Sequence, residues 1–362
     1  MKTVGLSNIP LNPPSKGDFD SPESFFNRDC KYFMEVMMEF WTRLLNVVLA
    51  IAIGCGGVIG LFYLANIAIN ALPKPWNQRL LPWVYISPAL LLLSAYLILP
   101  TVQTFYLSFL DGRSQNFVGL KNYTFAFTDR AMLIAFKNNL LWLVLVTGVS
   151  VSLGLIIAVL VDKVRYEPII KSLIFLPMAI SFVGASVIWK FMYAYKPAGD
   201  DQIGVLNALL VNFGFEPVGW IVEQSVNNFA LIAIMIWLYT GFAMVILSSA
   251  VKGIPEEVIE AARIDGANSW QIFWRITIPM IRSTILVVST TIIILVLKVF
   301  DIVFVMTGGN YGTEVIASRM IKEMFNYRNF GRGSAIAIVL LILIIPVMIS
   351  NIRRFRTQEK LR

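Results

Sequence analysis

The chain has 362 residues, of which 57% are hydrophobic and only 14% are charged, and its formal net charge is +8. Ordinary globular domains carry about 25% charged and about 45–50% apolar residues, so this composition excludes a typical soluble enzyme. The sequence contains no His, which removes the commonest general base and metal ligand. Cys30 and Cys55 are isolated, and therefore indicate neither a disulfide framework nor a metal knuckle. Positive charge in such an apolar chain is typical of cationic cytoplasmic loops rather than of nucleic-acid binding.

The N-terminal part divides into a polar tail and an apolar run. Residues 1–43 begin with a Pro- and Ser-rich stretch, which predicts disorder, and continue into an amphipathic segment at Tyr32 to Trp41. We expect that segment to lie as a helix along the membrane interface. Residues 44–72 are apolar, long enough to cross a bilayer, and too far from Met1 for a signal peptide. They predict one additional transmembrane helix ahead of the main group.

Six further apolar runs lie between residues 81 and 352. In lipid, every backbone polar group must be bonded within its own segment, so we predict an all-α, polytopic membrane protein. The expected spans are Leu81–Phe109, Asn139–Val161, Ile169–Tyr193, Phe229–Val251, Thr284–Met306 and Ser334–Ile352. They form a core domain over residues 81–352, and a basic cytoplasmic tail follows at residues 353–362.

The distribution of Lys and Arg predicts the orientation of these spans. If the loop at residues 252–283 faces the cytoplasm, thirteen Lys and Arg residues lie inside and eight lie in the outer loops. The positive-inside rule favours this choice. With one additional span in front, the N-terminal tail would lie outside, although Arg28, Lys31 and Arg43 do not favour that side.

The loop at residues 252–283 is the one long charged segment between two apolar runs. Its pattern consists of Glu260, Ala261, Ala262, Asp265, Gly266, Ile276 and Pro279. Glu256 and Glu257 in the first turn complement a helix dipole, and Gly266 lets the chain bend into a second helix from Ser269 to about Ile276. Two short helices with mixed apolar and acidic faces suit a groove on another protein.

This spacing resembles the signature loop of the membrane subunits of binding-protein-dependent ABC importers, in the maltose-type branch that imports sugars. The resemblance covers about Pro82 to Arg354 and includes Phe117–Tyr123, Leu176-Pro177 and the stretch from Phe300 to Gly309. The leading span and the run Leu107–Asp111 look most like α-glucoside and glucosylglycerol-type permeases. The resemblance implies a six-helix ABC importer permease core plus one N-terminal transmembrane helix.

The resemblance also implies a role for the loop and a set of partners. The loop would be the coupling helix, seated in a cleft of a cytoplasmic ATPase, with Glu260 facing the partner and Gly266 supplying the turn. The sequence has no Gly-x4-Gly-Lys-Ser/Thr phosphate loop, so we expect no cofactor on this chain, with ATP and Mg held by the ATPase. The expected partners are a second homologous permease, two ABC ATPase subunits, a periplasmic or lipid-anchored solute-binding protein and membrane lipids, without nucleic acid. The expected location is the bacterial inner membrane.

Ionisable and aromatic residues within the spans are candidates for a substrate pathway. Lys298 and Asp301 lie three positions apart, so in one continuous helix they would share a face and either form a structural ion pair or bind sugar hydroxyls. Aromatic rings can cover apolar sugar faces while hydroxyls fix orientation. The candidate pathway residues are Met178, Ser181, Phe182, Trp189, Tyr239, Thr240, Phe242, Thr291, Lys298 and Asp301. Helix packing is the commoner role for any one of them. Ile292 and Val296 are apolar where the maltose-type pocket is built, which argues against a maltose-like substrate.

Two rival functions remain at this point. The first is an ion-coupled secondary transporter that uses Lys298 and Asp301, which would leave the loop at residues 252–283 without an explanation. The second is a membrane-embedded hydrolase, which would need a nucleophile with a base or a pair of intramembrane carboxylates, in a chain without His.

Overall fold

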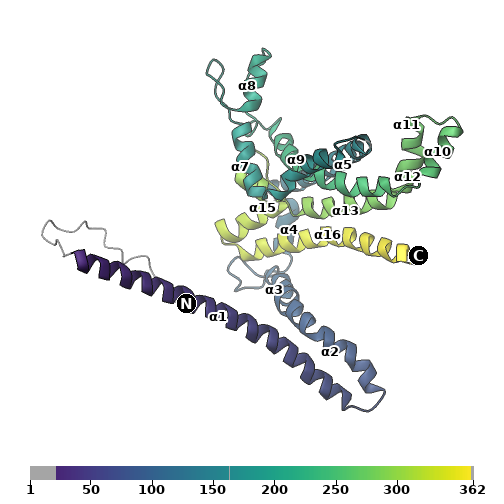
Figure 1. Cartoon of the computed structure of the whole chain (residues 1–362). Helices are drawn as coiled ribbons and strands as arrows, with labels where there is room; N and C mark the ends of the chain where they lie inside the picture. Colours follow the sequence, from purple (N-terminus) through teal and green to yellow (C-terminus); the bar gives the residue numbers. More distant parts are fainter. Residues whose placement is uncertain (1–21, 163, 360–362) are drawn as a thin grey trace. The chain divides into compact units, whose positions relative to one another are not determined.

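The chain is mainly helical in its described part, residues 22–162 and 164–359 of a computed structural model (Figure 1). Apart from one isolated bridge between Leu110 and Phe117, these residues contain no strand pairing. Five of the described helices are long and apolar enough to cross a membrane, or seven if two bent helix pairs each count as one span. The predicted all-α, polytopic fold class is confirmed. Residues 1–21 of the expected tail, and 360–362 of the expected basic tail, lie outside the described residues.

The first of two compact units is Met1–Tyr96. It contains α1 (Pro22–Asn70) and α2 (Trp76–Leu93). The two helices pack on each other, and the rings of Phe62 and Tyr85 stack with centroids 5.5 Å apart.

Helix α1 runs without a break through residue 43, where the sequence predicted a change from interfacial to transmembrane helix. Its membrane-length part is Val36–Asn70, longer than the expected run at residues 44–72. No Pro or charged residue interrupts residues 44–70, so nothing in that stretch stops an α-helix.

The second unit, Leu97–Arg362, is built on four long helices. They are α5 (Arg130–Val161), α9 (Asn227–Lys252), α13 (Arg282–Leu297) and α16 (Phe330–Glu359). Figure 1 shows α5 beside α9, and α13 beside α16. The main hydrophobic core combines apolar side chains of α5, α9 and α13, including the fully buried Trp142 and Ile292. Helix α9 is central because it contacts both α5 and α6 (Glu167–Phe175).

One glycine permits the closest of these approaches. A Cβ added at Gly241 of α9 would lie 2.3 Å from the carbonyl oxygen of Ile174 and 2.7 Å from the Cα of Phe175, both on α6. Real Cβ atoms do not approach backbone atoms so closely, and a larger side chain would push the two helices apart. Residue 241 therefore sets the spacing between α9 and α6.

Two of the predicted spans are broken in the structure. The expected Ile169–Tyr193 span consists of α6, a 3₁₀ turn η2 (Leu176–Ala179) and α7 (Phe182–Met192), and the two parts meet at 102°. Pro177 has no N–H to continue the α6 ladder, and the extended Ser181 starts α7 by accepting a hydrogen bond from the Gly184 N–H at 3.1 Å.

The expected Thr284–Met306 span is also interrupted. Helix α13 ends at Leu297, and α14 (Asp301–Thr307) starts after a three-residue break. The prediction that Lys298 and Asp301 share one helical face is therefore wrong. Asp301 instead begins a new helix, where a carboxylate complements the helix dipole.

Shorter elements complete the fold. They are η1 (Ser94–Ile98), α3 (Leu99–Leu107), α4 (Lys121–Thr128), α8 (Val205–Asn212), α10 (Glu256–Ile264), α11 (Ser269–Ile272), η3 (Phe273–Thr277), α12 (Ile278–Met280), α15 (Ile316–Ile321) and η4 (Lys322–Asn326). Helix α8 precedes the start of α9, and α10 follows its end. Helix α9 has 26 residues, so at about 1.5 Å per residue its two ends are about 40 Å apart.

Candidate functional site

The first helix of the 252–283 loop is set by its two ends. Helix α10 starts after Pro255, with Glu256 and Glu257 in its first turn. At its other end, Gly266 has a left-handed φ of 81°. The Gly266 N–H donates to the Arg263 carbonyl at 3.0 Å, and the Ala267 N–H donates to the Ala262 carbonyl at 2.9 Å. This pair of bonds is a Schellman motif, which explains why Gly stands at this position.

The second helix of the loop begins at a capping box. The Asn268 side chain accepts from the Gln271 N–H, and the Gln271 side chain accepts from the Asn268 N–H, both at 2.9 Å. The expected helix from Ser269 to Ile276 is present, but it widens into the π-helical turn η3. Thus the turn at residues 265–268 is the sharp bend that the sequence predicts at Gly266.

The loop presents its predicted coupling residues to the outside. Glu260, Ala261, Asp265, Gly266 and Pro279 are exposed, and Ala262 and Ile276 are half-buried. Glu260 forms no ion pair within the part of the chain that the structure describes. Ile264 is 86% exposed and Trp270 is 69% exposed, so apolar surface accompanies the acidic residues. A surface of this kind suits a groove on another protein.

A cavity of about 730 Å³ is lined by the loop and by the ends of α5 and α9. Its lining includes Asp162, Lys252, Glu256, Arg263 and Thr277. Beside this cavity, Phe273 of η3 packs against the hydrophobic core, so the loop is also held there.

A smaller pocket of about 280 Å³ lies at the break between α13 and α14. It is lined by Phe182, Met235, Leu295, Lys298, Val299, Phe300, Asp301 and Ile302. The pocket brings together three predicted pathway residues, Phe182, Lys298 and Asp301, from both broken spans. Lys298 and Asp301 form no ion pair with each other or with other described residues, so both charges remain available to the pocket.

The other predicted pathway residues lie around this pocket or apart from it. Tyr239 connects to it through its ring contact with Phe182 at 6.1 Å, and Phe242 in turn contacts Tyr239 at 6.3 Å. Met178 is exposed at the α6–α7 break, and Ser181 caps α7.

Three predicted residues are engaged in helix packing instead. Trp189 contacts the rings of Tyr193 and Trp237 rather than the pocket. The hydroxyls of Thr240 and Thr291 donate to carbonyls of their own helices, at 2.7 Å and 2.9 Å. These side chains do not line the 280 Å³ pocket.

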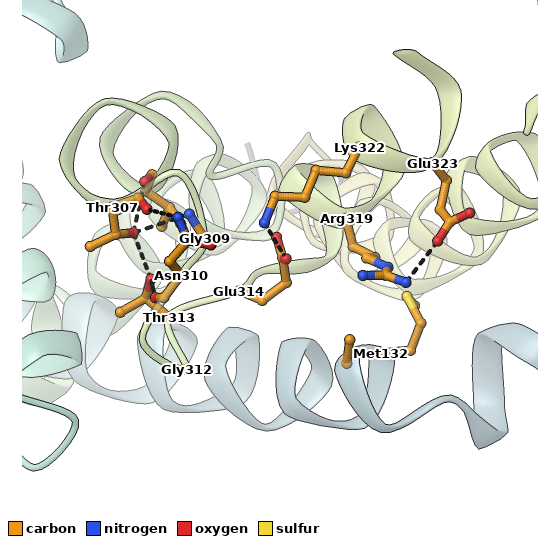
Figure 2. Close-up of polar contacts among 12 residues, drawn as sticks. Met132, Thr307, Gly309, Asn310, Gly312, Thr313, Glu314, Arg319, Lys322 and Glu323 are labelled. Carbon is orange, nitrogen blue, oxygen red and sulfur yellow. Dashed lines mark hydrogen bonds and ion pairs between the residues drawn. The ribbon is translucent and has the colours of Figure 1, made fainter. Parts of the chain in front are cut away.

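The chain that follows α14 contains a polar cluster that the sequence analysis did not find (Figure 2). The Thr307 and Thr313 hydroxyls are 2.6 Å apart, and the Gly309 N–H donates to Thr307. Lys322 pairs with Glu314 at 2.6 Å. Arg319 pairs with Glu323 at 2.8 Å. The i,i+4 spacing of that second pair was a signal in the sequence.

Glu323 is almost fully buried, and burial raises the pKa of its carboxyl above the ordinary value, against the opposing effect of Arg319 and Arg332. Asp129 lies on the other side of Arg319, at 3.8 Å. Because Asp129 caps α5, the cluster connects the start of that helix to α15 and η4.

Broken apolar helices around a pocket that contains two charged residues, with an exposed loop at one end, are typical of membrane transport proteins. The sequence pattern of the binding-protein-dependent transport system inner membrane components matches residues 150–354. The chain belongs to this family. It is a multi-pass protein of the bacterial inner membrane and a permease subunit of an ABC importer.

Individual relatives agree with this assignment. Over 279 residues the chain is 83% identical to the osmoprotective compounds uptake permease protein GgtC of Synechocystis sp. The match covers 77% of this chain and 100% of the relative. Over 273 residues it is 55% identical to the alpha-glucoside transport system permease protein AglF of Rhizobium meliloti, covering 75% and 81%.

Among solved structures, a chain of a bacterial ABC transporter that imports the acidic polysaccharide alginate matches with a TM-score of 0.67 and 22% identity. The match covers 78% of this chain and 98% of that one. At this identity the likeness concerns the fold alone. Neither the family nor these relatives support the ion-coupled rival.

Proposed function

We propose that this permease imports a small sugar or sugar-like compatible solute, of the α-glucoside or glucosylglycerol type, and forms half of the translocation pathway. The names of its relatives support this substrate class, since one takes up osmoprotective compounds and another takes up α-glucosides. The observation that carries the proposal is the pocket at the α13–α14 break, with Phe182, Lys298 and Asp301 in its lining.

The chemistry of this pocket suits a neutral polyol. The Phe182 ring can cover an apolar sugar face, while the Asp301 carboxylate accepts from hydroxyls and the Lys298 ammonium donates to them. One positive and one negative group give no net attraction for an acidic substrate. A volume of about 280 Å³ is near the lower end of ligand pockets, which favours a small solute over an oligosaccharide.

The loop at residues 252–283 then couples transport to ATP hydrolysis in partner subunits. Glu260, Ala261, Ala262, Asp265, Gly266, Ile276 and Pro279 form the contact with the ATPase. ATP and Mg are held by two ABC ATPase subunits, because this sequence has no phosphate loop. A second homologous permease completes the pathway, and a periplasmic or lipid-anchored binding protein delivers the solute.

The test is to purify the tagged protein with its co-purifying subunits and to measure ATP hydrolysis in the presence of the binding protein. We expect stimulation by glucosylglycerol or an α-glucoside, and none by a charged polysaccharide such as alginate. Stimulation by alginate alone would contradict the proposed substrate class. A complex without any ATPase subunit would contradict the proposed coupling.

A further inference from the structure

A cluster of four charged side chains lies where α5 and α9 end and α6 begins, beside the 252–283 loop. Lys252, the last residue of α9, pairs with Glu167 at 2.7 Å, and its ammonium lies 3.9 Å from Asp162. Lys171 lies one turn after Glu167 on α6. It also pairs with Glu167, and it donates to the Ser248 hydroxyl. The four charges cancel.

This cluster is not an ordinary surface ion pair. The side chains of Glu167 and Lys171 are 17% and 16% exposed, whereas exposed pairs are screened by water and contribute little. Lys252 is half-exposed, and three residues separate it from the start of α10. Glu167 is the first residue of α6. The Lys252–Glu167 contact therefore joins the start of the 252–283 loop to a different helix, α6.

Helix α6 continues this connection toward the pocket. It contacts α9 along its length, and the closest approach is at Gly241. Beyond α6, the chain breaks at Pro177 and restarts at Ser181. The next residue is Phe182, which lines the 280 Å³ pocket. A movement at Lys252 is thus connected through helix α6 to the Phe182 ring that lines the pocket.

We propose that the Lys252–Glu167 ion pair is the link through which movement of the coupling loop shifts α6 and, with it, Phe182. Both are positioning residues, since neither touches the pocket. The proposal rests on the proposed function, because it explains how the proposed loop and the proposed pocket communicate. Lys171 keeps Glu167 neutralised when Lys252 is replaced. Lys252→Gln therefore removes the link without leaving the mostly buried carboxylate of Glu167 unpaired.

The experiment measures solute imported per ATP hydrolysed in proteoliposomes that contain the complete complex. We expect Lys252→Gln and Glu167→Gln each to lower this ratio by at least about fivefold, the lower end of typical coupling between sites. The double variant should be no worse than Glu167→Gln alone, because Glu167→Gln already removes the Lys252–Glu167 contact. Lys252→Arg keeps the charge and should keep the ratio.

Two matched controls separate this link from a general charge effect. Asp162→Asn removes a carboxylate near the same lysine, but on α5, and should lower the ratio far less than Glu167→Gln. Arg165→Gln removes an exposed charge from the same segment and should leave the ratio unchanged. An unchanged ratio in Lys252→Gln, or equal losses in Asp162→Asn and Glu167→Gln, would overturn the link. So would loss of subunit assembly in both Gln variants, since the pair would then be structural.

A second measurement is independent of the transported solute. Spin labels at Met178, on the α6–α7 break, and at Val144, on α5, should change their separation when ATP binds the wild-type complex. The change should be lost in Lys252→Gln and kept in Lys252→Arg. Retention of the full change in Lys252→Gln would also overturn the link. A wild-type complex that moves but is stimulated by no sugar would instead contradict the proposed substrate class.

Discussion

At the scale of single residues, a few positions limit how closely two helices can pack. Gly241 is such a position, because a Cβ there would lie 2.3 Å from a backbone oxygen of α6. The sequence gives little sign of this role, since Gly241 is one of several small residues in an apolar run and only the packing partner reveals the constraint. In contrast, Phe182, Lys298 and Asp301 were predicted from the sequence. Charged residues at membrane depth, and an aromatic residue soon after a Pro, can be recognised without a structure.

Gly241→Ala should destabilise the second unit. Overpacking costs about 1–3 kcal/mol, and the clash here is with backbone, which cannot rotate away. Gly148→Ala on α5 is the matched control, since a Cβ there meets nothing within 4 Å. The measurement is the thermal midpoint of each purified variant in detergent. Equal midpoints for the two variants would show that α6 and α9 are not tightly packed.

Asp301→Ala should raise the solute concentration that gives half-maximal uptake by about tenfold, since a hydrogen bond to a charged group contributes about 1.5–3 kcal/mol. Tyr239→Ala should shift the same quantity less, because Tyr239 acts through its contact with Phe182. The control is Asp200→Ala, an exposed carboxylate outside the pocket. Uptake kinetics that are unchanged in both pocket variants would remove Asp301 and Tyr239 from the site.

At the scale of elements, sequence reasoning located the helices better than their breaks. Hydropathy reports only apolar length, so each expected span joined two helices, α6 with α7 and α13 with α14. Pro177 signalled the first break, but a Pro can also kink a helix that continues. No Pro or Gly marks the second break, between Leu297 and Asp301. The bend of the 252–283 loop was predicted well, because Gly266 and the acidic first turn of α10 are local features whose chemistry does not depend on distant residues.

Gly266→Pro and Glu260→Lys should each abolish uptake while leaving the amount of protein in the membrane unchanged. Proline cannot adopt the φ of 81° found at Gly266, so the two helices of the loop would lose their bend. Glu260→Lys reverses an exposed charge on the proposed ATPase contact. Gly266→Asn is the matched control, since Asn tolerates left-handed φ and should retain most uptake. Full uptake by both disruptive variants would refute the coupling role.

Glu323 should make stability depend on pH. Burial raises its pKa in the folded protein, so its favourable contribution is complete below the ordinary value near 4.5 and is lost as pH rises through the folded pKa. The thermal midpoint of the wild type, relative to that of Glu323→Gln, should therefore fall as the pH rises above 4.5. A relative midpoint that rises over this range would mean that the ion pair with Arg319 outweighs the effect of burial.

At the scale of the whole molecule, the second unit places two sites at different positions along α9. The exposed coupling loop follows the end of this helix, and Met235 of the pocket lies within it. The sequence predicted both groups of residues but not their connection, because the Lys252–Glu167 contact joins residues 85 positions apart. No local pattern reports such a pairing.

We propose that ATP hydrolysis in the partner subunits acts through the loop at residues 252–283 and drives import of a small neutral sugar through this subunit. The most direct test is uptake of labelled solute into proteoliposomes that contain the purified complex and its binding protein. We predict uptake that requires ATP, is lost in Glu260→Lys, and persists when ion gradients are dissipated. Uptake that survives without ATP and stops when the ion gradient is dissipated would contradict this account.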